Sequence, residues 1–253
     1  MKENRLKKRI EEGKVGFGII GPTVDPTICE YVGLTGMDFY MMDGEHGAIT
    51  ASEVTNMVRA CELVNTTPLA RIRSVDTKLI LQYMDAGVMG VMMPSIDTVD
   101  DVKKLVEAIK YPPFGKRGLG PVRVADYMQG SMSQAEYVEY ANKQTLVLPQ
   151  IESLECVKNL PELCKIDGVD GFIIGPRDLA MSMGYYDGPG HDEVKKQLDE
   201  IFETINQSNK WFGTVAGSAA QAESLIEKGA SFIMNSVQGL IKVSGNAFLE
   251  ARK

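Results

Sequence analysis

The residues best suited to chemistry in this chain stand at the ends of apolar runs. They are Asp43, Glu45, His46, Arg71, Glu152 and Asp178. If those runs are parallel strands of one barrel, their carboxyl ends meet at a single rim. Such a rim would combine carboxylates for a cation, an arginine for an anion and an imidazole for proton transfer.

Glu152 and Asp178 are the best candidates for metal ligands. Two carboxylates leave four positions of an octahedral shell to water and substrate oxygens, which suits Mg²⁺ or Mn²⁺ and accommodates Co²⁺. Each acid also has an ordinary explanation, since Glu152 opens a predicted helix and Asp178 follows the turn at Gly175-Pro176. Their shared position after two strands favours the metal site.

His46 and Arg71 are the candidates for proton transfer and anion binding. Asp43 lies three residues before His46, close enough to orient the ring of a general base that works near neutral pH. Arg71 suits a carboxylate or a developing enolate oxygen, and a salt bridge to Glu45 or Asp43 is its alternative role. The second histidine, His191, lies in a glycine-rich loop and is interpreted as a surface residue.

The elements that must position these residues alternate between strands and helices. Apolar runs predict strands at 15–20, 38–42, 67–72, 89–93, 146–151, 171–174, 211–216 and 231–235. Amphipathic patterns predict helices near 3–12, 26–34, 51–64, 76–86, 97–109, 133–143, 153–165, 192–208, 218–228 and 237–250. This order predicts an α/β protein, a (β/α)₈ TIM barrel over residues 1–253, preceded by an N-terminal helix.

Local signals support these boundaries. Thr50 and Glu53 are spaced as a helix start, and Gly87 and Gly229 are placed as helix ends. Two glycine- and proline-rich connections, 111–118 and 184–190, are expected to be substrate-covering loops.

One glycine pattern points to a different fold. The segment Gly16-x-Gly18-x-x-Gly21 matches a dinucleotide fingerprint, but no apolar strand precedes it. We therefore interpret these glycines as strand backbone that lies close to another strand or to the substrate.

Charge and composition exclude several classes of function. The chain has 253 residues and a net charge of −7, which argues against nucleic acid or an anionic membrane as a partner. No apolar stretch reaches the roughly 20 residues of a membrane span. The four cysteines show no ligand spacing and are expected to be buried free thiols, so we expect a cytoplasmic protein.

Several segments together resemble the HpcH/HpaI aldolases, the metal-dependent (class II) pyruvate aldolases. They are DFYMMDGEHG at 38–47, Ala70-Arg71, Gln82 to Pro94 with Asp85-Ala86-Gly87, YPPxGxRGxG at 111–120, Gln150-Ile151-Glu152 and GPxDL at 175–179. They span most of the chain in the order found in that family. The closest-looking members act on 4-hydroxy-2-oxo diacids.

The resemblance implies a role for each site residue. In a barrel of the pyruvate/phosphoenolpyruvate type, Glu152 and Asp178 would hold the divalent metal, and Arg71 would contact the keto or enolate oxygen. His46 would be the base, with Asp43 and Glu45 beside it. A neighbouring subunit would contribute Asp85, and the pyruvate site would include Pro94, Gln150 and the backbone near Arg177. An eighth helix swapped with a neighbour would give homo-oligomers, dimers that assemble to a hexamer.

The predicted reaction is reversible retro-aldol cleavage of a 4-hydroxy-2-oxo acid to pyruvate and an aldehyde. No lysine follows a strand where it could form a Schiff base. Arg177, Ala216-Gly217-Ser218 and 234–239 depart from the family pattern and are expected to shape the aldehyde pocket. Two alternatives remain: a lyase for hydroxyacyl-coenzyme A thioesters, and a non-catalytic keto-acid-binding barrel blocked by Arg177.

Overall fold

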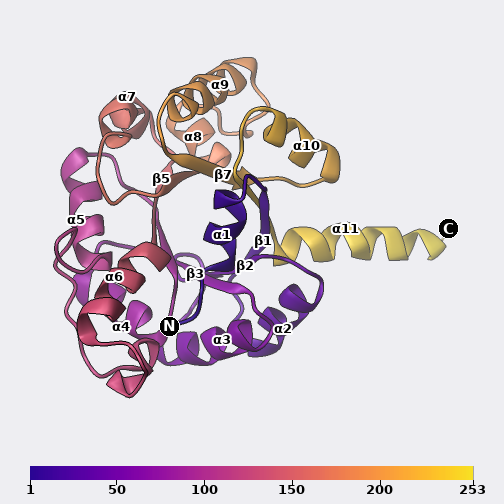
Figure 1. Ribbon diagram of the computed structural model, residues 1–253. Coiled ribbons are helices and arrows are strands. Elements are labelled where there is room, and N and C mark those ends of the chain that lie inside the picture. Colours follow the sequence, from indigo (N-terminus) through magenta and orange to yellow (C-terminus); the bar gives the residue numbers. More distant parts are fainter. Residues whose placement is uncertain (253) are drawn as a thin grey trace.

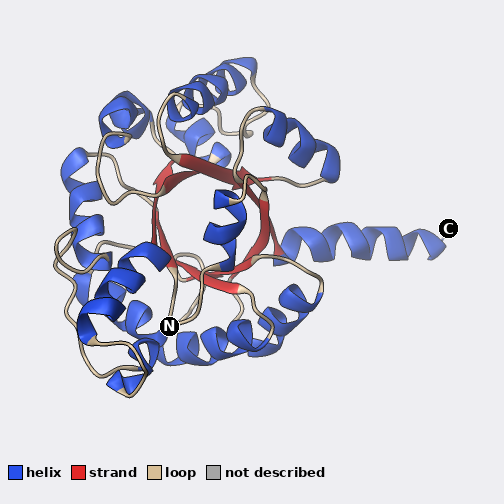
Figure 2. Ribbon diagram, viewed as in Figure 1, coloured by secondary structure: helices blue, strands red, loops and turns tan. Residues whose placement is uncertain are grey.

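Eight parallel strands close into a barrel, as the sequence predicts. The computed structural model describes residues 1–252. The strands are β1 (Gly16–Gly21), β2 (Phe39–Asp43), β3 (Thr67–Arg71), β4 (Gly90–Met93), β5 (Leu146–Ile151), β6 (Gly171–Ile174), β7 (Trp211–Val215) and β8 (Phe232–Ser236). They follow one another around the ring in chain order, and β1 closes it by pairing with β8 (Figure 2). No strand end differs from its predicted position by more than one residue.

The chain also forms helices, most of which surround this ring (Figure 1). They are α1 (Arg5–Glu11), α2 (Pro26–Leu34), α3 (Ala51–Leu63), α4 (Thr77–Ala86), α5 (Val99–Ile109), α6 (Gln134–Gln144), α7 (Leu154–Leu163), α8 (Pro176–Ser182), α9 (Asp192–Asn206), α10 (Ala219–Glu227) and α11 (Val237–Leu249), with 3₁₀ turns η1 (Arg123–Met128) and η2 (Glu250–Arg252). The predicted helices are confirmed, whereas α8 and η1 were not expected. None of the helices in residues 1–252 is long and apolar enough to cross a membrane.

The helix ends follow the local signals in the sequence. Thr50 and Glu53 form the reciprocal capping box of α3, which satisfies N–H groups that the first turn leaves unpaired. Gly87 ends α4 at φ 114°, and Gly229 follows α10 at φ 98°. These left-handed conformations favour glycine because a side chain would be strained there.

The interior of the barrel is filled by side chains and closed at one end by α1. In Figures 1 and 2, α1 lies within the outline of the strand ring. Leu6 and Ile10 of this helix pack against inward-facing Phe39, Leu69 and Phe232. The Asn4 side chain caps α1 and donates to the backbone oxygen of Gln144, at the end of α6, at 2.8 Å. The amino-terminal helix is therefore a plug at the end where the strands begin.

Gly18 lies in a crowded part of the barrel interior. A Cβ atom at this position would lie 2.5 Å from the ring of Phe39, closer than atoms can approach. Gly16, Gly18 and Gly21 all fall within β1. The glycine pattern therefore serves close packing inside the barrel, and its interpretation as strand backbone is confirmed.

The connection 111–118 is not at the end of the barrel that we expected. It follows α5, which runs back from the carboxyl end of β4, so it lies where the strands begin. Arg117 of this connection pairs with Asp85 at the end of α4 (Nη2 to Oδ1, 2.8 Å). The prediction that it covers the substrate site of the same chain was wrong. The connection 184–190 follows α8 and lies at the carboxyl end of the strands.

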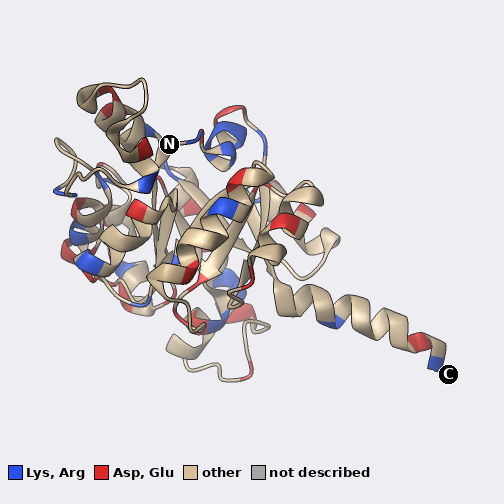
Figure 3. Cartoon of the chain, turned by 90° about the horizontal axis from the view of Figure 1, so that it is seen from below, with Lys and Arg blue, Asp and Glu red and all other residues tan. Residues whose placement is uncertain are grey.

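The last long helix, α11, projects away from the barrel (Figures 1 and 3). Among residues 237–252, only Lys242, Glu250 and Arg252 are charged. Ile241 and Phe248 are exposed on this helix. Because α11 projects away from the barrel, Phe17 on the outer face of β1 is also partly exposed. An apolar cavity of about 220 Å³ lies between β1, α10 and the start of α11.

Candidate active site

The polar residues predicted from strand ends lie at one end of the barrel. Asp43 and Arg71 are the last residues of β2 and β3, Glu152 follows β5, and Asp178 lies in the first turn of α8 after β6. A cavity of about 300 Å³ opens here. It is lined by Glu45, His46, Ser95, Asp97, Glu152, Ser153 and Asp178.

Arg71 links Asp43 at the end of β2 to Glu45 in the β2–α3 connection. Its Nε and Nη2 atoms donate to the two carboxylate oxygens of Asp43 at 2.9 and 2.6 Å, and its Nη1 atom lies 3.0 Å from Glu45 Oε2. Burial by itself would raise the pKa of Asp43, but the hydrogen bonds and charge of Arg71 outweigh it and lower that pKa. Arg71 is therefore a fixed cation behind the cavity, with two of its five N–H groups left for an anion.

His46 is not oriented as we predicted. The carboxylate of Asp43 accepts from the backbone N–H groups of Glu45 and His46, each at 3.2 Å, and is otherwise taken up by Arg71. The His46 ring lies beside Glu45 instead, with Nε2 3.9 Å from Oε2. Its side chain is 69% exposed and lines the cavity. Asp43 thus shapes the loop that carries His46, and the acid nearest the ring is Glu45.

Glu152 has a donor on each carboxylate oxygen. The backbone N–H of Ser95 donates to Oε1 at 2.7 Å, and Gln150 Nε2 donates to Oε2. Burial raises the pKa of Glu152, and the negative charges of Asp178 and Glu45 add to the rise. Ser95 holds its N–H in place with a left-handed backbone (φ 52°), which is unusual for a residue with a side chain. Pro94, which precedes it, is buried.

Asp178 and Arg177 lie together in the first turn of α8, and both are exposed. Asp178 lines the cavity, whereas Arg177 does not. The blocking role considered for Arg177 therefore has no support in its position.

Asp85 is the one predicted site residue that lies apart from the others. It is at the end of α4 where the strands begin, in an ion pair with the buried guanidinium of Arg117. It cannot reach the cavity of its own chain across the length of the barrel, so only a neighbouring copy could use it.

A divalent cation fits the donor set of the cavity. Four of the seven lining residues are acids, and neither lysine nor arginine is among them. The raised pKa of Glu152 comes partly from the nearby charge of Asp178, which a cation between them would offset. Within residues 1–252 no three His, Cys, Asp or Glu side chains form a preformed metal cluster. Glu152 and Asp178 would therefore leave most of a coordination shell to water and substrate.

Three lining residues were missed by sequence analysis. Ser95 and Asp97 follow β4, and Ser153 follows Glu152. The signal that identified the other site residues, a polar residue just past a strand end, also marks these three. The two serines were passed over because their side chains carry no charge, and Asp97 because it is the first residue of the helix predicted at 97–109.

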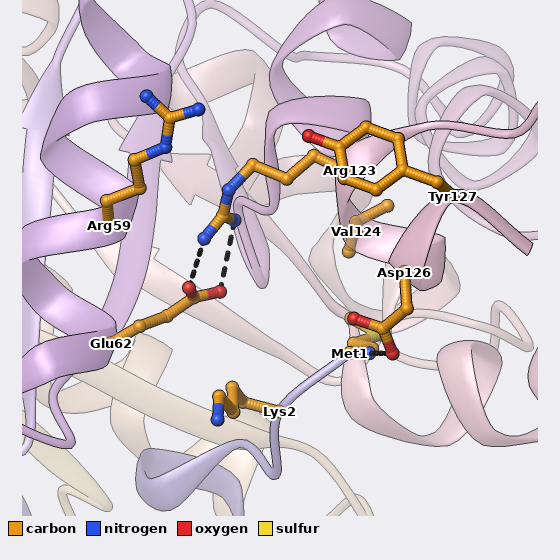
Figure 4. Close-up of a pocket in the computed structure, with 8 residues that line it drawn as sticks. All are labelled: Met1, Lys2, Arg59, Glu62, Arg123, Val124, Asp126 and Tyr127. Atoms are coloured by element: carbon orange, nitrogen blue, oxygen red, sulfur yellow. Dashed lines mark hydrogen bonds and ion pairs between the residues drawn. The ribbon is translucent and has the colours of Figure 1, made fainter. Parts of the chain in front are cut away.

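A larger cavity at the opposite end of the barrel lacks this chemistry. It has a volume of about 450 Å³ and lies where the strands begin (Figure 4). Its Glu62 is paired with Arg123, and its Asp126 with the amino terminus of Met1. Both acids are thus neutralised, so the smaller cavity is the better candidate.

Known proteins resemble this chain over most of its length. A hydroxypyruvate/pyruvate aldolase of Pseudomonas aeruginosa is 32% identical over 230 residues, covering 91% of this chain and 85% of that protein. A 2-keto-3-deoxy-L-rhamnonate aldolase of Escherichia coli is 29% identical over 238 residues, covering 94% and 88%. The crystal structure of an HpcH/HpaI aldolase from Desulfitobacterium hafniense has a TM-score of 0.92 and 26% identity, covering 98% of this chain and 96% of that one. The family model for HpcH/HpaI aldolase/citrate lyase matches residues 18–243, and the chain belongs to this family of carbon–carbon lyases.

Proposed function

We propose that this protein catalyses the divalent-metal-dependent, reversible aldol cleavage of a 4-hydroxy-2-oxo acid to pyruvate and an aldehyde. The observation that carries the proposal is the joint position of Glu152 and Asp178 on one cavity, beside a fixed arginine and an exposed imidazole. The named aldolases that resemble the chain over most of its length add support.

Glu152 and Asp178 would hold the cation, which is Mg²⁺, Mn²⁺ or Co²⁺. When bound, it supplies a Lewis acid that polarises the 2-oxo group of the substrate. Ser95 and Gln150 hold Glu152 with their two hydrogen bonds, so this ligand is set before the cation arrives.

Arg71 is the group that stabilises negative charge. Asp43 and Glu45 fix its guanidinium, and its remaining N–H groups would donate to the oxygen that becomes the enolate when the C3–C4 bond breaks. Because the Arg71 guanidinium is already held in place, it needs to move little as the negative charge develops. The backbone N–H groups around Arg177 and Asp178 in the first turn of α8 would donate hydrogen bonds to the pyruvate carboxylate, and Gln150 and Pro94 would form the adjacent wall.

His46 is the proposed base. In cleavage it takes the proton of the C4 hydroxyl group, and in the reverse direction it returns that proton to the new alkoxide. Glu45 lies near the ring and favours the imidazolium that forms. Asp43 contributes indirectly, through the loop and through Arg71.

We further propose a homo-oligomer in which α11 packs on a neighbouring copy and Asp85 completes a neighbour's site. The projecting helix carries exposed Ile241 and Phe248, and the outer face of β1 beside it is uncovered at Phe17. Such apolar surface is favourably buried against a second copy. Light scattering should give a multimer for the wild type and a smaller species for Ile241→Asp combined with Phe248→Asp.

The central experiment measures pyruvate release from racemic 4-hydroxy-2-oxo acids. The wild type is compared with Glu152→Gln and with Glu155→Gln, an exposed acid one turn along on α7 that does not line the cavity. Chelation and Glu152→Gln should each abolish turnover, and Glu155→Gln should leave it at the wild-type rate. Turnover that survives exhaustive chelation would overturn the metal proposal.

A further inference from the structure

Among residues 1–252, one acid in the cavity has neither an ion-pair partner nor a place beside the proposed cation. Four acids line the cavity: Glu45, Asp97, Glu152 and Asp178. Glu45 is paired with Arg71 at 3.0 Å. The divalent cation of the proposed function would offset Glu152 and Asp178. Asp97 is then left as the carboxylate without a counter-charge.

Asp97 is held firmly although it has no ion-pair partner. Ser153 Oγ donates to its Oδ1 atom, and its backbone oxygen accepts from Asn159 Nδ2 at 2.8 Å. Among residues 1–252, no lysine or arginine nitrogen lies within 4.0 Å of its carboxylate. Arg177, the exposed cation nearest in sequence to the metal ligands, does not line the cavity. The negative charge of Asp97 is therefore a fixed property of the space in which an acceptor must lie.

A carboxylate in this setting selects against one class of aldehyde. An anionic acceptor would be repelled in a partly enclosed site, because a fixed like charge cannot rearrange to avoid it. A hydroxyl group, by contrast, can donate to the second oxygen of Asp97 and bond with the hydroxyls of Ser95 or Ser153. The volume of about 300 Å³ suits a small acceptor.

We infer that the acceptor aldehyde is small, neutral and hydroxylated, and that Asp97 is the residue that excludes carboxylated aldehydes. This inference rests on the proposed aldolase function and narrows its substrate. It also departs from the expectation of a 4-hydroxy-2-oxo diacid, whose cleavage would release an aldehyde bearing a carboxylate.

Two aldehydes of equal chain length test the inference. Glycolaldehyde carries a hydroxymethyl group and glyoxylate carries a carboxylate on the same carbonyl carbon. The Mn²⁺-loaded enzyme is given pyruvate with each, and kcat/KM is compared. The wild type should prefer glycolaldehyde, and Asp97→Asn should shift the ratio toward glyoxylate by about tenfold or more. Asp97→Glu, which keeps the charge, should retain the preference for glycolaldehyde.

A matched control separates local from general effects. Asp100→Asn removes an exposed charge three residues away, in the first turn of α5, and should leave the ratio at its wild-type value. A wild-type preference for glyoxylate, or an unchanged ratio in Asp97→Asn, would overturn the inference.

Failure of the inference can be told apart from failure of the proposed function. Exchange of the pyruvate methyl protons with D₂O, with no aldehyde present, tests enolate formation alone. Exchange together with a preference for glyoxylate would reject the role of Asp97 and leave the aldolase intact. If exchange and aldol addition are both absent, the proposed function fails and the inference fails with it.

Discussion

The guanidinium of Arg71 and the carboxylate of Asp43 form a paired, two-hydrogen-bond contact at the carboxyl ends of β2 and β3. Both side chains are about nine-tenths buried. Removing one member of a buried ion pair leaves the other charge without compensation, at a cost of about 3–5 kcal/mol. We expect Asp43→Asn to lower the free energy of unfolding by this order and to reduce kcat by about 10²-fold, since Arg71 loses its orientation. Urea unfolding and steady-state kinetics measure the two effects. A variant with wild-type stability would contradict the structural importance of the pair.

The same pair predicts sensitivity to acid. The pKa of Asp43 is lower in the folded protein than its ordinary value of 3.8. Its contribution to stability is therefore complete above that ordinary value and is lost as the pH falls toward the folded-state pKa. The difference in unfolding free energy between wild type and Asp43→Asn should shrink in this acidic range. A difference that stays constant from neutral pH to pH 2 would show that the pair does not contribute in this way.

The pKa of Glu152 is raised, whereas that of Asp43 is lowered, and the raised pKa predicts that metal affinity depends on pH. Burial raises its pKa above 4.5, so the protonated form persists to a higher pH than for an ordinary glutamate. Because a carboxylic acid must lose its proton to bind a cation, Mn²⁺ affinity should begin to fall at a pH above 4.5 as the solution is acidified. Calorimetric titration with Mn²⁺ at several pH values measures this. Glu152→Gln should weaken binding by about 10-fold to 100-fold near neutral pH, and its difference from the wild type should shrink as the solution is acidified.

Ser95 offers a test of how the ligand is positioned. Its backbone conformation is left-handed, which glycine adopts without strain and a β-branched residue does not. Ser95→Gly should retain the N–H bond to Glu152 and wild-type Mn²⁺ affinity. Ser95→Val should cost about 1–3 kcal/mol of stability and weaken Mn²⁺ binding. Equal metal affinity in the two variants would argue against the positioning role of this N–H group.

His46 can be tested against the second histidine. His46→Ala should reduce kcat by about 10²–10⁴-fold with little change in stability, because the side chain is exposed and its proposed role is proton transfer. His191→Ala provides the control, since His191 pairs with Asp187 in the connection 184–190 and does not line the cavity. It should keep wild-type kcat. Unchanged turnover in His46→Ala would remove the base assignment.

The barrel could be predicted from the sequence because each of its strands and helices shows a residue pattern of its own. Each buried strand appears as a short apolar run, and each covering helix as an amphipathic stretch, so their alternation fixes the fold. The helix α8 was missed because its seven residues are too few to show a period and they follow the turn signal Gly175-Pro176, of which Pro176 is the first helical residue. The 3₁₀ turn η1 has left-handed residues at Asp126, Tyr127 and Met128, which no sequence pattern here signals.

The sequence predicts which residues lie together at this end of the barrel, but not which of their side chains pair with one another. Strand ends bring Asp43, Arg71, Glu152 and Asp178 to one rim, and this follows from topology alone. Which acid faces which base depends on loop conformation. Asp43 and His46 are three residues apart, yet the carboxylate turns toward Arg71 on the neighbouring strand, because a buried cation attracts it more strongly than an exposed ring.

The plug formed by α1 has a practical consequence for handling this protein. Leu6 is fully buried against inward-facing residues of the barrel, and the α-amino group of Met1 is bonded to Asp126. An affinity tag fused directly to the first residue would have to leave the protein beside α1. Removing residues 1–10 would expose the interior of the barrel to water at the end where the strands begin. For purification and crystallisation, the start of the chain should be left as it is.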